Sequence, residues 1–387
     1  MRITPASKLA IVVLFSLALA GGFAIQPNSA QISGAQINKL VASASGVSDY
    51  ARISSRRLNE QVLVEVKGYD LNNPVLLKSR AFAIGRAVMH ADPGYVRGVV
   101  TRFTDTSGSS VDLMVTGKDL VSVEAGIDGR EKVISAIPMV SLPAGSSTRS
   151  RFSGYSDQGG ILLKDNELYA AWTFFQWAEN QDREYARQDS AFLRRLFGLG
   201  RAFDLRGDFN QADDVYNHLL DLLGSGPATD GSANHVQPDS IRQIASYFVG
   251  QSQFDKALKA ALLLSAYQNS QPFNKRKNFV SDVRLLALCY RKQGKVVDAR
   301  RELEGALLIS RNKRGESNPD VALILEDLGD CYKTEGKKSE ALEFYGQAKR
   351  KYDTSMAARQ SSQRLDFEIY QSAMRRLSDK IKNLKAI

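Results

Sequence analysis

Four alanines at near-equal spacing constrain the fold of this chain more than any other feature. Ala212, Ala257, Ala299 and Ala341 follow one another at intervals of 45, 42 and 42 residues. An internal period of this size is typical of repeat proteins, in which each unit buries its apolar face against its neighbours. The sequence therefore predicts an array of stacked repeats in the C-terminal half of the chain.

The residues around each alanine have the sizes that packed helix pairs require. A small residue, Gly200 in the first copy and Gly329 in the last, lets two helices approach closely. An aromatic residue recurs in every copy and fills the gap between repeats, at Phe203, Phe248, Tyr290 and Tyr332. A glycine follows in three predicted turns, where a left-handed backbone conformation ends the first helix, at Gly207, Gly294 and Gly336. Each repeat is predicted to be two antiparallel helices.

The last copy, at residues 325–352, reads LEDLGDCYKTEGKKSEALEFYGQAKRKY. It resembles the tetratricopeptide repeat (TPR) family, whose signature is L-G-x-x-Y, a turn glycine, an alanine, an aromatic residue and a second alanine. The family period is about 34 residues, so the longer period here is similar to that of kinesin light chain repeats. This resemblance implies a mainly α fold with a C-terminal α-solenoid of TPR-like helix pairs in a right-handed superhelix. It also implies a non-enzymatic scaffold that binds a protein or peptide in a concave groove.

Four repeats are predicted at residues 191–223, 239–270, 279–311 and 319–353, within a repeat domain that spans 164–387. After them, apolar residues recur at steps of three and four, at Phe367, Tyr370, Met374, Leu377, Ile381 and Leu384. This spacing predicts an amphipathic helix. We expect it to cap the open end of the solenoid; a short coiled-coil seam is the alternative.

Residues 31–138 carry mixed signals that predict a small α/β domain. Residues 61–69 alternate apolar and polar side chains, as in a strand, and Pro74 opens a stretch with helical spacing. The predicted elements, in order, are a helix at 36–44, a strand at 61–69, a helix from 74, strands at 95–104 and 110–116, and helices at 118–124 and 130–137. Residues 139–163 are rich in Ser and Gly, which predicts a linker to the repeats.

The first 30 residues have the pattern of an export signal. Arg2 and Lys8 precede an apolar stretch from Leu9 to Ala20, which ends in the small-x-small sequence Ala18-Leu19-Ala20. A second cleavage position follows Ala30. We expect a periplasmic or secreted protein; in the alternative, residues 9–25 remain as a membrane anchor.

The TPR resemblance also implies which residues face the groove. Among twenty such positions, seven are basic and four are acidic, which favours a protein or peptide partner with an acidic or carboxylate-ended segment. The residues predicted to contact it are Arg194, Phe197, Arg201, Arg242, Arg284, Arg291, Lys292 and Lys333. In the alternative, these are solvated faces of surface helices. The asparagines of the family's carboxylate clamp are missing at these positions.

No motif for a cofactor, a metal or catalysis stands out. His90, His218 and His235 are scattered without ligand spacing, and no P-loop occurs. Nucleic acid is not expected as a partner, because no recognised binding module accompanies the formal charge of +10. An alternative function assigns residues 31–138 to a small ligand-binding or enzymatic domain, with a pocket formed by residues near Arg80, Arg86, His90 and Arg102.

Overall fold

The computed structural model describes residues 32–45, 53–58, 61–93, 96, 98–224, 237–272, 275–276, 278–315, 318–358 and 364–386. The predicted export signal at residues 1–30 lies outside these residues. The chain divides into two compact units, Met1–Ala186 and Arg187–Ile387.

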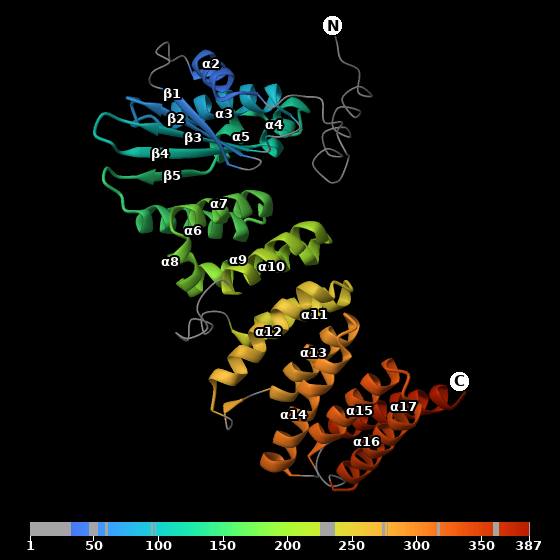
Figure 1. Cartoon of the computed structure of the whole chain (residues 1–387). Helices are drawn as coiled ribbons and strands as arrows, with labels where there is room; N and C mark the ends of the chain where they lie inside the picture. The colour runs from blue at the N-terminus through green and yellow to red at the C-terminus, as the bar shows by residue number, and fades with distance from the viewer. Residues whose placement is uncertain are drawn as a thin grey trace. The chain divides into compact units, whose positions relative to one another are not determined.

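The N-terminal unit is built on one mixed sheet of five strands (Figure 1). The strands lie in chain order, with β2 and β3 parallel and the other neighbouring pairs antiparallel. They are β1 (Ile53–Leu58), β2 (Gln61–Lys67), β3 (Gly98–Thr104), β4 (Ser110–Thr116) and β5 (Met139–Leu142). The sequence did not predict β1, whose residues ISSRRL are largely polar, or the four-residue strand β5.

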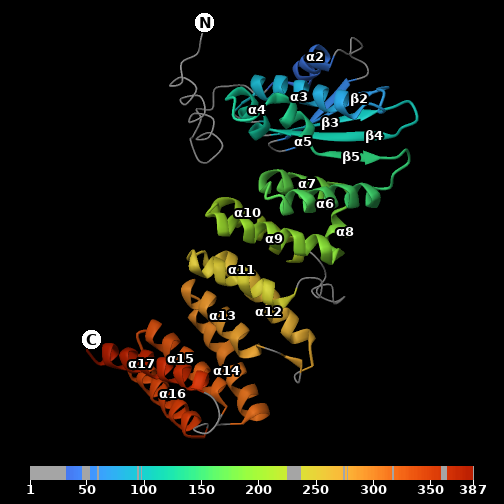
Figure 2. The same cartoon turned by 180° about the vertical axis from the view of Figure 1, so that it is seen from behind.

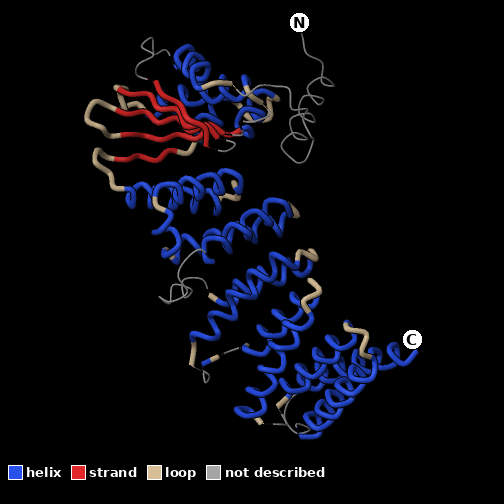
Figure 3. The backbone as a smooth tube through the Cα atoms, viewed as in Figure 1, coloured by secondary structure: helices blue, strands red, loops and turns tan. Residues whose placement is uncertain are grey.

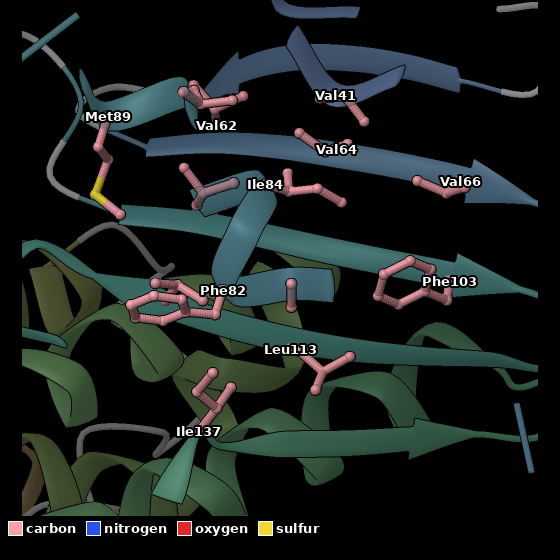
Figure 4. Close-up of a cluster of buried hydrophobic side chains, with 14 of the residues drawn as sticks. Val41, Val62, Val64, Val66, Phe82, Ile84, Met89, Phe103, Leu113 and Ile137 are labelled. Atoms are coloured by element: carbon pink, nitrogen blue, oxygen red, sulfur yellow. The ribbon is translucent and has the colours of Figure 1, made fainter. Parts of the chain in front are cut away.

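Helices α2 (Gly34–Ser45), α3 (Pro74–Ala91), α4 (Gly117–Glu124) and α5 (Arg130–Ala136) lie along one face of this sheet (Figures 1 and 2). Helix α3 is the crossover between the parallel strands β2 and β3. The Asn73 side chain accepts a hydrogen bond from the backbone amide of Leu76, and Pro74 occupies the first turn of the helix. Alternate residues of the central strands β2, β3 and β4 point into an apolar core against α3 (Figure 4).

Helices α6 (Thr148–Lys164) and α7 (Leu168–Gln181) cover the other face of the sheet, and α8 (Arg183–Gln188) follows. The linker predicted at 139–163 is therefore wrong, since these residues form β5 and most of α6. The reason is packing: β3 and β4 are buried on both faces and need a second helical layer. The glycines of this segment let neighbouring elements pack closely against α6. A Cβ on Gly159 of α6 would lie only 2.6 Å from the Phe175 ring of α7.

The C-terminal unit contains the four predicted helix pairs, and among its described residues there is no strand (Figure 3). Their helices are α9 (Ser190–Arg206) and α10 (Phe209–Gly224), α11 (Pro238–Gly250) and α12 (Phe254–Ser270), α13 (Phe279–Lys292) and α14 (Val296–Arg314), and α15 (Pro319–Thr334) and α16 (Lys338–Ala358). Helix α17 (Arg364–Ala386) packs against α16 and buries Ala373, Leu377 and Leu384 in the core of the last repeats. The predicted amphipathic helix is thus present and covers this core.

Both cysteines, Cys289 and Cys331, are buried free thiols. Burial raises the pKa of the Cys289 thiol to about 11 and that of Cys331 to about 12. Among the described residues, no helix combines the length and the apolar character that a membrane span requires.

The turn glycines adopt the conformation that their positions predict. Gly207, Gly294 and Gly336 have φ values of 81°, 78° and 76°, in the left-handed region where a side chain is unfavourable. The helix glycines Gly200 and Gly329 have a different role. A Cβ at either position would lie 2.5 Å from the ring of Tyr216 or Tyr345, respectively, on the second helix of the same repeat.

We therefore expect Gly329→Ala to destabilise the C-terminal unit by about 1–3 kcal/mol, because a Cβ there forces the Tyr345 ring out of its packed position. Gly305→Ala is the matched control: Gly305 lies inside α14, and a Cβ there meets no atom within 4 Å. This change should stabilise the helix by up to about 1 kcal/mol. Urea unfolding followed by far-UV circular dichroism measures the free energy of unfolding of both variants. Changes of the same sign and size in the two variants would contradict the close packing of Gly329 against Tyr345.

Candidate functional site

A cavity of about 330 Å³ lies between α13, α15 and α17 in the C-terminal unit. Residues one or two helical turns apart lie on one face of a helix, which brings two basic side chains from α13 and two from α17 into this space. Helix α13 contributes Arg284 and Arg291, and α17 contributes Arg376 and Lys380. The acidic lining residues come from α15 and are Glu326, Asp327 and Asp330.

Glu326 is the centre of an ion-pair network, and its side chain is 1% exposed. Its carboxylate accepts two hydrogen bonds of 2.9 Å from Arg376, one of 2.8 Å from Lys380 and one of 3.2 Å from Tyr352. Burial opposes ionisation of this carboxyl, but the hydrogen bonds and charges of Arg376 and Lys380 outweigh it and lower its pKa to about 2. Glu326 is therefore anionic at neutral pH and binds α17 to α15.

The two other carboxylates have partners as well. Asp330 accepts hydrogen bonds from Lys380 at 2.8 and 3.0 Å and from the Tyr345 hydroxyl at 2.7 Å. Asp327 accepts two from the guanidinium of Arg284. Arg291 is held more loosely, since its guanidinium lies 3.5 Å from Asp330 and forms no closer ion pair among the described residues.

The charges that line the cavity do not balance. Arg284, Arg291, Arg376 and Lys380 supply four positive charges, against three carboxylates, so one positive charge is in excess. Charges in such partly enclosed places are screened less than those on an open surface. The residues that line the cavity therefore carry a net positive charge.

The predicted groove residues are placed differently from one another. Arg284 and Arg291 line the cavity, but Arg242 does not: it forms two hydrogen bonds to Asp282 on α13, at 2.5 and 2.8 Å. Phe197 is half-buried, with its ring centroid 6.2 Å from that of Tyr216. The remaining predicted residues are exposed and do not line the cavity, namely Arg194, Arg201, Lys292 and Lys333.

Sequence reasoning did not identify Arg376, Lys380 and Asp327 as site residues. Arg376 and Lys380 are four residues apart, so they share a face of the terminal helix. That spacing indicates a basic face on the helix, but the sequence alone does not identify the carboxylates of α15 as its partners.

The residues of the alternative N-terminal pocket do not form one site. Arg102 is buried on the sheet face that α6 and α7 cover, where it donates to Asp112 and Tyr155. Arg86 and His90 lie on α3 instead, and both contact Glu124 Oε1, at 3.0 and 2.7 Å. Among the described residues, no group of His, Cys, Asp and Glu has the arrangement of a metal site.

The comparisons with known proteins concern the repeats. The tetratricopeptide repeat family model matches residues 280–353, which covers α13 to most of α16. No curated protein sequence matches the chain.

Solved structures similar to this chain are repeat proteins of low sequence identity. The TPR-like repeats of a putative kinesin light chain from Podosopora anserina are 16% identical, cover 55% of this chain and 99% of their own, and have a TM-score of 0.38. YrrB, a TPR protein with an unusual peptide-binding site, is 16% identical, with 54% and 91% coverage and a TM-score of 0.32. MamA from Desulfovibrio magneticus RS-1 is 12% identical, with 56% and 100% coverage and a TM-score of 0.32.

The matched repeat class indicates a scaffold for protein–protein interaction. The family match also falls where the LG-x-x-Y signature, the turn glycines Gly294 and Gly336 and the packed ring of Tyr345 occur. Residues 280–353 of this chain are tetratricopeptide repeats, as their sequence predicts.

Proposed function

We propose that this protein is a non-enzymatic scaffold that binds a segment of a protein partner on the first helices of its repeats. A carboxylate of that segment occupies the charged cavity between α13, α15 and α17. The observation that carries the proposal is the excess positive charge of the cavity, where four basic side chains share three carboxylates. Arg291 has the loosest ion pair of the four and is 23% exposed, so its guanidinium is the donor for the partner's carboxylate.

The proposed binding site is smaller than the groove that the sequence predicts. Arg242 and Arg284 each form ion pairs with a carboxylate of the next first helix, so their charge is largely neutralised within the protein. A continuous basic groove along all the repeats therefore has less support than one cavity near the C-terminal end. The partner segment is then acidic at one position rather than along its length.

The proposed location is outside the cytoplasm, either periplasmic or secreted. Its support is the pattern of residues 1–30, with Arg2 and Lys8 before the apolar stretch from Leu9 to Ala20. Sequencing of the mature N-terminus from the native compartment tests this part. A full-length chain that stays in the cytoplasm contradicts it.

The binding proposal is tested with peptides selected from a random library on the full chain, each synthesised with a free carboxyl end and as the amide. We expect carboxylate forms to bind more tightly, and Arg291→Ala to weaken their binding about tenfold. The reason is that a hydrogen bond to a charged group contributes about 1.5–3 kcal/mol, and tenfold corresponds to about 1.4 kcal/mol. Fluorescence polarisation of labelled peptides measures the dissociation constants.

Lys292→Ala is the matched control for this test. Lys292 is the next residue on α13 and carries the same charge, but it does not line the cavity. Both variants lower the net charge by one, so a general electrostatic effect changes binding equally in the two. Equal losses, or equal binding of carboxylate and amide peptides, would count against the cavity as the binding site.

A further inference from the structure

The N-terminal unit has a second cavity of about 330 Å³, which has no part in the proposed scaffold function. Helix α3 supplies one wall, because Phe82, Arg86 and His90 follow one another at four-residue steps along one face. Ala83 and Ala87 of the same helix and Arg130 of α5 line it as well. Its volume is at the lower end of the range for small-molecule sites, about 300–1,000 Å³.

Two polar side chains of this cavity, Arg86 and His90, are held by the same carboxylate. Glu124, at the end of α4, accepts from Arg86 Nε at 3.0 Å and contacts His90 Nε2 at 2.7 Å through the same oxygen. The ion pair uses Nε of Arg86, so it does not occupy the two terminal guanidinium nitrogens. Arg130 lies over the Phe82 ring, with its guanidinium carbon 5.9 Å from the ring centroid.

We propose that this cavity binds a small organic carboxylate with a flat apolar body. The carboxylate lies between Arg86 and Arg130, where guanidinium groups form paired hydrogen bonds to it. The apolar body rests against Ala83 and Ala87, which line the cavity together with the largely buried Phe82.

Charge complementarity selects this ligand class. Two guanidinium groups, of Arg86 and Arg130, line the cavity, and one carboxylate, Glu124, pairs with Arg86, so one positive charge is in excess. A neutral apolar ligand would leave that charge without a counterion, and a highly charged ligand would gain nothing from the apolar lining residues. Phe82 also connects the site to the fold, because it belongs to the core between α3 and the sheet (Figure 4).

The test uses 2-naphthoate as the probe and 2-naphthamide as its neutral counterpart, with isothermal titration calorimetry on the full chain. We expect saturable 1:1 binding of the naphthoate in the millimolar range or tighter, and at least fivefold weaker binding of the amide. Arg130→Ala should weaken naphthoate binding about fivefold or more, since Arg130 supplies half of the carboxylate contacts. Arg130→Lys should restore part of the affinity, because it keeps the charge.

Lys132→Ala is the matched control, because Lys132 lies two residues after Arg130 on α5, is paired with Asp128 and does not line the cavity. A bound ligand also raises the unfolding temperature of the unit that contains it. Trp172 and Trp177 are the two tryptophans of the chain and both lie in α7, so their fluorescence reports this unit. Equal binding of acid and amide, no saturable binding up to 10 mM, or equal affinity of Arg130→Ala and wild type would overturn the proposal.

Discussion

Asp112→Ala is expected to lower the free energy of unfolding of the N-terminal unit by about 3–5 kcal/mol. Asp112 is 1% exposed and accepts two hydrogen bonds from Arg102, at 2.8 and 2.7 Å, and one from the Tyr155 hydroxyl. Without this carboxylate, the buried guanidinium of Arg102 keeps Glu65 at 3.2 Å as its ion-pair partner. Glu65 is one-third exposed, so it compensates poorly for a buried charge.

Tryptophan fluorescence during urea unfolding measures this loss, because both tryptophans lie on α7 of the same unit. The control is the double variant Arg102→Met with Asp112→Leu, which removes both buried charges together. Replacing a buried ion pair by apolar residues of similar size is often neutral or stabilising. The account predicts that the double variant is more stable than Asp112→Ala, and the opposite order would refute the role given to the unpaired charge.

The second large effect is a loss of stability of the C-terminal unit in acid, which comes from Glu326. Its folded pKa of about 2 lies below the ordinary value of 4.5. A depressed carboxyl pKa stabilises the folded state above the unfolded pKa, and this stabilisation is lost as the pH falls towards the folded pKa. The 2.5-unit difference corresponds to about 3 kcal/mol, which should disappear between about pH 4.5 and pH 2.

Glu326→Gln isolates this contribution, because the amide keeps the size of the side chain and does not titrate in this range. Chemical unfolding followed by far-UV circular dichroism at a series of pH values measures the stability of both proteins. The pH dependence between 4.5 and 2 should be about 3 kcal/mol smaller in the variant than in wild type. The same acid dependence in both proteins would show that Glu326 does not connect α17 to α15 in this way.

The repeats could be predicted closely because their signals are local and recur. Small, aromatic and turn residues return at the same offsets, so each copy supports the assignment of the others. The family model match at 280–353 and the helix pairs confirm this part. Gly200 and Gly329 lie at equivalent positions in two different repeats. Each packs against a tyrosine on the second helix of its own repeat, Tyr216 and Tyr345 respectively, as the equivalent positions predict.

The second helical layer of the N-terminal unit could not be predicted from composition. Ser and Gly between 139 and 163 are typical of flexible segments, but here they form a helix with a flat surface for close contact. Gly154 lies against Val140 and Gly159 against Phe175, contacts made with residues distant in the chain. The amino-acid composition of a segment contains no information on such contacts.

Only part of the candidate site could be predicted from the sequence, because the family pattern covers the first helices of the repeats but not their contacts with other helices. The family pattern indicates that Arg284 and Arg291 lie on a first helix and face the groove, and both line the cavity. The pattern contains no information on which arginines are neutralised by the next repeat, as Arg242 is by Asp282. It also does not cover α17, from which Arg376 and Lys380 reach the carboxylates of α15.

A partner segment that binds where α13, α15 and α17 meet should protect the backbone of these three helices. Hydrogen–deuterium exchange of the full chain measures this protection, with and without a selected carboxylate peptide at saturating concentration. The account predicts slower amide exchange in residues 279–292, 319–334 and 364–386 when the peptide is bound. Protection confined to residues 53–186, or to α9 and α11 alone, would contradict it.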